Sequence, residues 1–540
     1  MRAAAVCAVT VGLAACDHAG TASRGSAGTV VIAAVREPAV VFPPLVGESL
    51  GRDIGDQIWE RLADLIPGGA PTDTSAYRPR LAAAWERVDS LTWRFHLRPG
   101  ARWQDGVPLT AEDVRFSFGA FTDSTVDSQA RGALAGRVHI AVEDSATFLV
   151  RFSEASPEQL YDATYHVRIL PRHVWASRPP ATWSADTSVA LLIGSGSYRL
   201  RTWKRGEFIL LEADSTAARR PRIGRVLWRF TDDPDAAINL ALAGEADLLE
   251  QVGPPSQQAR FRGDSTFELR PYPSALYGFL AFRLADSAGR PHPTFGRREV
   301  RRALALAIDR STMARALLGP GTRAPAGPMS AMLWIGSNGI SVLPFDTLAA
   351  GRALESSGWR SAGAVRSLGE RPLRFDILVP STSSVRKQAA VMLQEAWRRV
   401  GAEVSVTAVD FPVFEERIRH GKFDTYIGAY LDEPSPRGIA DQFGRAGWDQ
   451  LNYGRYANPA FDSLLAQAGR ERSVTGGRRL YQEALDTLNA DAPALFLYAP
   501  SNVAAIRHTL AGVRLNPYSW LADLPEWELT VDGGARLGLR

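Results

Sequence analysis

Cysteine is almost absent from this chain. Its 540 residues include only Cys7 and Cys16, both near the amino terminus. If the chain is cut before Cys16 and that cysteine is acylated, the mature protein has no thiol left for a disulfide, a catalytic cysteine or a zinc site. The eight histidines form no His-x-x-x-His pair and no compact cluster with acids. We therefore expect neither a metal site nor a cofactor.

Lysine is also scarce, since only three of the 62 basic residues, Lys204, Lys387 and Lys422, are lysines. The net charge is nevertheless only +4, because 58 acidic residues are scattered among the arginines. We interpret the arginine bias as codon usage rather than as selection for anion binding. Aromatic residues do not alternate with a basic stripe, so nucleic-acid binding is not expected.

No hydrophobic run is long enough to cross a bilayer. The apolar stretch that ends at Cys16 falls short of the roughly 20 residues that a spanning helix needs, so we interpret residues 1–15 as an export signal. Leu13-Ala14-Ala15-Cys16 resembles the lipobox of bacterial lipoproteins, which implies lipidation of Cys16. An ordinary secretory signal is the alternative. The Gly-, Ser- and Ala-rich residues up to 28 then predict a flexible tether, 16–28.

Residues 93–118 carry the most informative local pattern. Trp93, Phe95 and Leu97 alternate with polar residues, as in a strand with one apolar face. Thr110 and Asp113 have the spacing of a helix cap, because a carboxylate three residues after the cap satisfies the cap amide and the positive helix end. We therefore predict a strand, two turns and a helix in this stretch.

Predicted strands and helices alternate along the rest of the chain, which is typical of an α/β protein. At this length two or three domains are expected, because one core rarely grows so large. Strands are predicted at 29–35, 373–379 and 404–406, and helices at 53–65, 236–243, 300–308, 346–357 and 389–400.

No pattern supports an enzyme. The glycine-rich segment 193–198 is followed by a predicted strand, whereas a phosphate-binding loop is followed by a helix. The same segment lacks the Gly-x-Ser-x-Gly order of a nucleophile elbow. The neighbouring carboxylates of Glu415 and Glu416 fit a solvated helix face.

An ordered series of segments resembles the bacterial extracellular solute-binding proteins of family 5, which deliver peptides, nickel chelates and related solutes to ABC importers. The resemblance implies an α/β fold with the two lobes of a class II (cluster C) periplasmic binding protein and an extra small α/β domain. The segments that carry it are 77–100, 101–118, 168–175, 193–198, 244–247 and 298–310.

The resemblance also implies a division of the chain. Domain I would comprise 29–52 and 182–270, domain II 53–181, and domain III 271–495, with a return to domain I at 496–540. The implied protein is a lipid-anchored monomer at the extracytoplasmic face of the cell envelope. It would capture a solute between two hinged lobes and pass it to an ABC permease and ATPase.

Peptides are the favoured solutes, and metal chelates or other organic solutes are the alternative. An envelope sensor or adhesion lipoprotein with the same fold is another reading. An envelope hydrolase is a third, and turnover of peptides or esters by the purified protein would reveal it.

The candidate solute-binding residues also follow from the resemblance. Peptide-binding members pair an aspartate with the free amine of the ligand, and alignment on Pro434 puts Tyr430 at that position. Asp432 shares the face of Tyr430 by strand alternation. Either Asp432 replaces the aspartate, or the solute has no amine there and Tyr430 stacks on it or donates a hydrogen bond, or Tyr430 only packs between the lobes. The further candidates, named by position in the same cleft, are Tyr426, Trp448, Asn452 and Tyr277.

Overall fold

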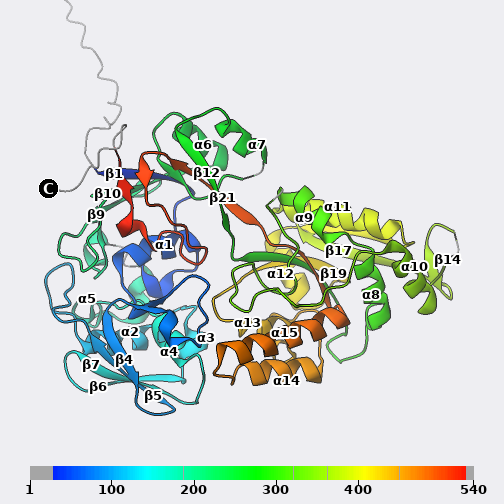
Figure 1. Ribbon diagram of the computed structural model, residues 1–540, viewed down its shortest axis with the longest axis horizontal. Helices are drawn as coiled ribbons and strands as arrows, with labels where there is room; N and C mark the ends of the chain where they lie inside the picture. The colour runs from blue at the N-terminus through cyan, green and yellow to red at the C-terminus, as the bar shows by residue number, and fades with distance from the viewer. Residues whose placement is uncertain are drawn as a thin grey trace, which may run out of the picture.

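The computed structural model describes residues 28–185, 188–253, 255–319, 321–361, 363–448 and 450–530. The expected signal, Cys16 and nearly all of the expected tether lie outside the described residues. The chain forms two lobes, which lie on the left and the right of Figure 1. Of the described residues, those between 28 and 273 and between 501 and 530 form the first lobe, and those between 276 and 498 form the second.

A seven-stranded mixed sheet is the framework of the first lobe. β1 pairs in parallel with β10 and β11, and the other neighbours are antiparallel. The predicted strand at 29–35 is confirmed as β1, a central strand of this sheet. In sheet order the strands are β12 (Phe267–Pro273), β21 (Ser501–Arg507), β11 (Leu248–Leu249), β1 (Thr29–Val35), β10 (Arg225–Thr231), β9 (Phe208–Ala213) and β8 (Tyr198–Lys204). The helices of this part are α1 (Ser49–Ile58), α6 (Pro234–Leu242) and α7 (Pro255–Gln258).

A four-stranded antiparallel sheet forms the lower part of the first lobe in Figure 1. Buried side chains of the two sheets, such as Phe95 and Trp228, belong to one hydrophobic core. In sheet order the strands are β4 (Ala82–Arg87), β5 (Thr92–Leu97), β7 (Thr147–Phe152) and β6 (Val138–Val142), with a separate pair of β2 (Ala63–Leu65) and β3 (Tyr77–Pro79). The helices are α2 (Ala111–Thr122), α3 (Arg131–Leu134), α4 (Gln159–Thr164) and α5 (Arg172–Trp175).

The pattern of residues 93–118 is confirmed. Trp93, Phe95 and Leu97 are buried along β5. The amide of Thr110 donates to Asp113 Oδ2 at 2.8 Å, so the acid occupies the amino-terminal turn of α2 as predicted.

The second lobe is built on a five-stranded mixed sheet with helices packed around it. Trp359 and Trp397 are fully buried in its core, and Trp397 Nε1 donates to the Leu304 carbonyl at 2.9 Å. In sheet order the strands are β18 (Glu403–Val409), β17 (Arg374–Pro380), β19 (Thr425–Leu431), β13 (Leu276–Phe282) and β20 (Ala494–Tyr498). The helices are α8 (Arg298–Leu306), α9 (Arg310–Leu318), α10 (Thr347–Ser356), α11 (Ser384–Arg398), α12 (Phe411–Arg419), α13 (Gly438–Phe443), α14 (Pro459–Ala468) and α15 (Val474–Asp491).

Small sheets complete the fold. The second lobe has a three-stranded sheet of β14 (Arg360–Ser361), β15 (Arg366–Leu368) and β16 (Arg371–Pro372). The first lobe has a two-stranded ribbon near its carboxyl end, made of β22 (Leu510–Ala511) and β23 (Glu528–Leu529).

Two short connections join the lobes. One runs from β12 to β13 and the other from β20 to β21. They lie beside each other, because the Ser274 amide donates to the Pro500 carbonyl at 3.4 Å. A pair of adjacent short connections is the geometry of a hinge, in which a few residues absorb the backbone rotation.

The helix predicted at 53–65 is wrong in its limits. The observed α1 covers Ser49–Ile58, and residues 63–65 form strand β2. The helix stops because the Ile58 carbonyl accepts the amide of Gly196, at 2.7 Å, instead of an amide one turn further on. One limit of the predicted domains, between residues 52 and 53, falls inside α1, and the domain limits stay a prediction.

Gly194 lies in a position that excludes a side chain. A Cβ atom added there would be 1.8 Å from the Ile58 carbonyl oxygen. Gln104 holds both backbone groups of Gly194, each at 3.0 Å. The glycine-rich segment 193–198 is therefore a close packing contact between the carboxyl end of α1 and the strand β8 that follows.

Candidate functional site

A loop of the second lobe, residues 432–437, reaches across to the first lobe directly after β19. Three cavities surround it. Pro434 lines a cavity of about 330 Å³, Glu433 lines one of about 150 Å³, and Asp432 lines one of about 480 Å³. All three have walls from both lobes, so this loop marks the cleft between them.

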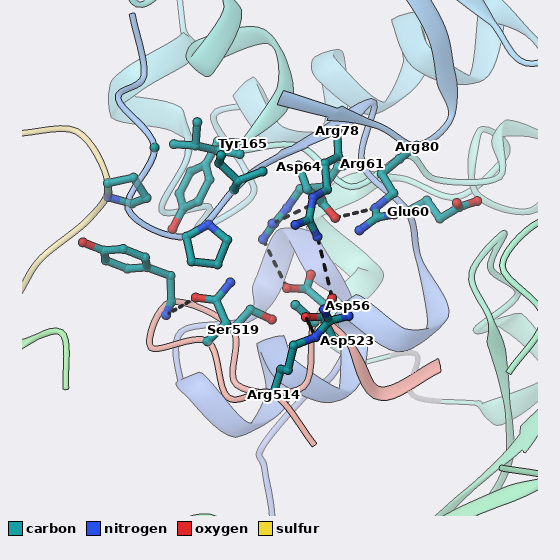
Figure 2. Close-up of a pocket in the computed structure, with 18 of the residues that line it drawn as sticks. Asp56, Glu60, Arg61, Asp64, Arg78, Arg80, Tyr165, Arg514, Ser519 and Asp523 are labelled. Carbon is teal, nitrogen blue, oxygen red and sulfur yellow. Dashed lines mark hydrogen bonds and ion pairs between the residues drawn. The ribbon is translucent and has the colours of Figure 1, made fainter. Parts of the chain in front are cut away.

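The first of these cavities has a strongly charged wall (Figure 2). We call it the arginine cavity. Its first-lobe wall includes four acidic residues, and Met332, Trp334 and Pro434 come from the second lobe. The five arginines of the first-lobe wall are Arg61, Arg78, Arg80, Arg219 and Arg514.

Ion pairs between neighbouring segments fix the arginine wall. Arg61 lies 3.1 Å from Asp56 of α1 and 3.9 Å from Asp64 of β2, and its guanidinium stacks over the Tyr165 ring at 5.1 Å. Arg80 Nε lies 2.5 Å from Asp64 Oδ2. These contacts, several of which are dashed in Figure 2, hold the guanidiniums in a fixed array beside the cavity.

Ion pairs across the cleft hold the lobes together. Arg437 of the second lobe binds Asp162 of α4 through two nitrogens, at 2.5 and 3.1 Å, and its Nε lies 2.7 Å from Glu158 Oε2. Ser435 Oγ donates to the same Glu158 oxygen at 2.6 Å. We call these four residues the Arg437 clamp.

The two acids of the Arg437 clamp respond differently to their surroundings. Burial raises the pKa of Glu158, and the attraction of Arg437 offsets only part of that rise. Burial also acts to raise the pKa of Asp162, but hydrogen bonds from His166 and Arg437 hold it below its ordinary value. Asp162 therefore keeps its charge in the clamp more readily than Glu158 does.

Asp432 is a half-buried carboxyl group at the edge of its cavity. Its backbone amide donates to the Ala275 carbonyl at 2.8 Å, next to the hinge, and its Oδ2 accepts the amide of Ser330. The partial burial raises its pKa to about 7, although the hydrogen bonds from Ser330 act in the opposite direction. A solute cation would provide the opposite charge that a carboxylate withdrawn from water requires.

Tyr430, Tyr277 and Tyr426 form part of an aromatic cluster in the second lobe. Tyr277 and Tyr430 are partners on β13 and β19, and the Tyr430 ring lies 5.1 Å from that of Phe279. Tyr277 is fully buried and its hydroxyl bonds Gln442. Tyr426 is also buried, whereas Tyr430 is half-buried and donates to the Leu451 carbonyl at 3.2 Å.

Trp448 and Asn452 stabilise a loop of the second lobe. Trp448 Nε1 donates to the Tyr456 carbonyl at 2.8 Å. Asn452 is buried, donates to the carbonyls of Gly444 and Tyr456 at 2.9 and 2.8 Å, and accepts the Tyr456 amide at 3.1 Å. The polar groups of both side chains therefore already have partners within their own lobe.

Within the part of the chain that the structure describes, no helix is long and apolar enough to cross a membrane. Among the same residues, no three His, Cys, Asp or Glu side chains come together in a group that could hold a metal ion.

Comparison with known sequences decides the family. Residues 76–449 match the profile of the bacterial extracellular solute-binding proteins, family 5 (middle part). The chain belongs to this family. It is 30% identical to Protein XP55 of Streptomyces lividans, over 92% of this chain and 88% of that protein. It is 23% identical to the oligopeptide-binding protein AppA of Bacillus subtilis, over 93% of this chain and 92% of that protein.

Solved structures show that this family 5 protein has the expected fold. The structure of AppA from Bacillus subtilis in complex with a nonapeptide superposes with a TM-score of 0.73 at 22% identity, over 93% of this chain and 99% of that one. NikZ from Campylobacter jejuni in complex with Ni(L-His) gives a TM-score of 0.74 at 21% identity, with the same coverage. The predicted two-lobed α/β fold class is confirmed.

Of the six predicted solute-binding residues of this family 5 protein, Asp432 lines one of the three interlobe cavities. Tyr430 lies two residues before it on the second lobe, and the other four belong to the interior or to a loop of that lobe. No sequence pattern predicted the arginine wall or the Arg437 clamp. Their residues come from segments far apart in the chain, and their charges are unremarkable one by one.

The raised pKa of Asp432 predicts how solute binding depends on pH. If the solute presents an amine to Asp432, that amine pairs with the carboxylate form, so protonation of Asp432 competes with binding. We expect the affinity to be highest above pH 7 and to fall up to about tenfold for each unit below it. Calorimetric titration between pH 5.5 and 8.5 measures this change.

The control for this prediction is the same solute with its amine acetylated, which should bind with little pH dependence in this range. Asp432→Asn should likewise flatten the pH profile. An amine-bearing solute that binds equally well at pH 5.5 and 8.5 would contradict the pairing with Asp432.

Proposed function

We propose that this protein captures a peptide or a related organic solute in the cleft between its lobes and delivers it to an ABC permease and its ATPase. The observation that carries the proposal is the arginine cavity, which has walls from both lobes and lies between lobes joined by a two-connection hinge. A solute in it contacts both walls only when the lobes are closed, so binding favours the closed state.

Peptides are the favoured solute class. Support comes from the similarity to the oligopeptide-binding protein AppA over nearly the whole chain. The volume of the arginine cavity, about 330 Å³, lies at the small end of ordinary ligand sites, which favours a short peptide over a long one. Main-chain hydrogen bonds, as in strand addition, would allow several sequences to bind.

We also propose the setting in which the protein acts. The export signal that the sequence predicts before Cys16 supports an extracytoplasmic protein that is anchored through lipid on Cys16. The protein would act as a monomer, since each chain supplies both lobes and the cleft between them. The predicted sites at Tyr430 and Asp432 belong to the same proposal, with Asp432 as the partner of a solute amine.

Identification of the co-purifying solute tests this proposal. Mass spectrometry of the released small molecules should detect a peptide, and adding that peptide back at about 100 times its Kd should stabilise the protein by about 2.7 kcal/mol. X-ray scattering should show a smaller radius of gyration with the peptide than without it. A scattering curve that stays unchanged at saturation would contradict capture by closure.

A further inference from the structure

The arginine cavity has more guanidinium groups than carboxylates to neutralise them. Five arginines and four acids line it, and the acids are shared. Asp64 lies between Arg61 and Arg80, and Asp56 binds both Arg61, at 3.1 Å, and Arg168, at 2.7 Å. Each of these two carboxylates therefore serves two cations.

The other end of the wall shows the same shortage of acids. Asp523 lies 3.3 Å from Arg514 and 4.0 Å from Arg78. The remaining acid, Glu60, lies 2.6 Å from Arg98, a residue that is not part of the wall. Among the residues that the structure describes, Arg78 thus has a single long ion pair, and 52% of its side chain is exposed.

Arg219 is the second guanidinium of the wall whose charge is only partly neutralised by carboxylates. Burial lowers its pKa, and repulsion by Arg80 lowers it further. Its contacts are the Ala522 carbonyl at 3.2 Å and Glu526 at 3.5 Å. Glu526 also bonds Arg514, so this carboxylate is shared as well. The negative charge of Asp523 attracts Arg219 and also pairs with Arg78. The two guanidiniums therefore lie in the same part of the wall.

None of the described second-lobe residues that line this cavity is acidic. Its contribution consists of Met332, Trp334 and Pro434, which are apolar surfaces apart from the indole nitrogen. Asp432 and Glu433 of the same lobe line the other two cavities. At this cavity the excess of positive charge therefore lies on the first-lobe side. The Arg437 clamp has the opposite arrangement, with the carboxylates on the first lobe and the guanidinium on the second.

We infer that the arginine cavity selects peptide-like solutes with an acidic side chain, which Arg78 and Arg219 bind through its carboxylate. This inference rests on the proposed function, because it names the solute class of the same cleft. Arginine suits this role, since its planar fork binds carboxylates through two hydrogen bonds. The abundance of arginine in the whole chain reflects composition, but the excess over acids in this wall is a property of the fold.

The test is selection from a mixed tripeptide library. The purified protein, freed of bound solute, is mixed with the library, and the retained peptides are identified by mass spectrometry. We expect peptides with Asp or Glu to be enriched at least fivefold over their Asn and Gln counterparts. Arg78→Gln, at a largely exposed position, should reduce this enrichment to twofold or less while peptides with Gln stay bound.

The matched control is Arg374→Gln, which removes an arginine from an exposed ion pair with Glu403 on the second lobe. It should retain the enrichment. Equal retention of acidic and amide peptides, or enrichment of Lys peptides, would overturn the inference and leave the proposed function intact. Retention of no peptide at all would overturn the proposed function and this inference with it.

Discussion

Replacing Arg437 by methionine is expected to weaken solute binding at least tenfold. The change removes the guanidinium that joins Asp162 and Glu158 to the second lobe, and leaves both acids without their cation when the lobes close. Truncating one partner of a buried charge pair costs about 2 to 5 kcal/mol, and here that cost applies to the closed state. In the open state water solvates the two acids, so the change shifts the equilibrium toward opening.

Calorimetry with the co-purified solute measures the loss of affinity, and scattering measures the opening as a larger radius of gyration. Arg399→Met is the matched control, because Arg399, directly after α11, forms an exposed pair with Glu395 of that helix at 3.3 Å. Such pairs contribute less than about 1 kcal/mol, so this variant should bind like the wild type. Unchanged affinity and unchanged scattering in Arg437→Met would show that the clamp does not hold the closed state.

The two acids of the clamp provide a second control, because their opposite pKa shifts predict opposite effects of their charges on closure. The pKa of Glu158 is raised in the closed state. The negative charge that Glu158 acquires as the pH rises above the ordinary pKa of a glutamate therefore opposes closure. Asp162 has a lowered pKa, so it favours closure at neutral pH and loses that effect only in acid. Glu158→Gln can still accept the Ser435 hydroxyl, and we expect it to bind solute as well as the wild type at pH 7, in contrast to Arg437→Met.

Replacing Gly194 by alanine is expected to destabilise the first lobe by about 3 kcal/mol, at the upper end of the usual cost of overpacking. The new Cβ would overlap the Ile58 carbonyl oxygen. The backbone cannot move away easily, because Gln104 binds both the amide and the carbonyl of Gly194. Urea denaturation measures the change as a lower midpoint of the first-lobe transition.

Gly119→Ala provides the comparison. Gly119 is exposed in α2, and a Cβ atom there would meet nothing within 4 Å. Alanine is the better helix former, so this variant should be as stable as the wild type or more stable by about 0.5 to 1 kcal/mol. If Gly194→Ala unfolds at the same urea concentration as Gly119→Ala, the close contact with α1 has no energetic weight.

The elements that sequence predicted correctly are those decided by nearby residues. Trp93, Phe95 and Leu97 define β5 by alternation, and Thr110 with Asp113 defines the start of α2, because strand faces and helix caps involve residues a few positions apart. Periodicity alone extended α1 beyond Ile58. The chain turns there because the last carbonyl of the helix accepts a hydrogen bond from Gly196, about 140 residues further along the chain. No local sequence pattern predicts such a contact.

The same distinction holds for the site. Asp432 was named from the family resemblance and from strand alternation beside Tyr430, and it lines an interlobe cavity, but its role in binding stays a prediction. The arginine wall could not be predicted, because Arg78, Arg219 and Arg514 become neighbours only when strand β3, the connection between β9 and β10 and the carboxyl-terminal segment pack together. In the sequence these arginines look like the many others that lie on ordinary surface.

The position of β1 determines which lobe the proposed lipid anchor would attach to. This strand begins at Thr29, immediately after the expected tether, and is central in the sheet of the first lobe. If Cys16 is lipidated as we propose, the anchor would connect to the lobe that carries the arginine wall. The lobe that carries Asp432 would then be the one that moves away from the anchored lobe when the cleft opens.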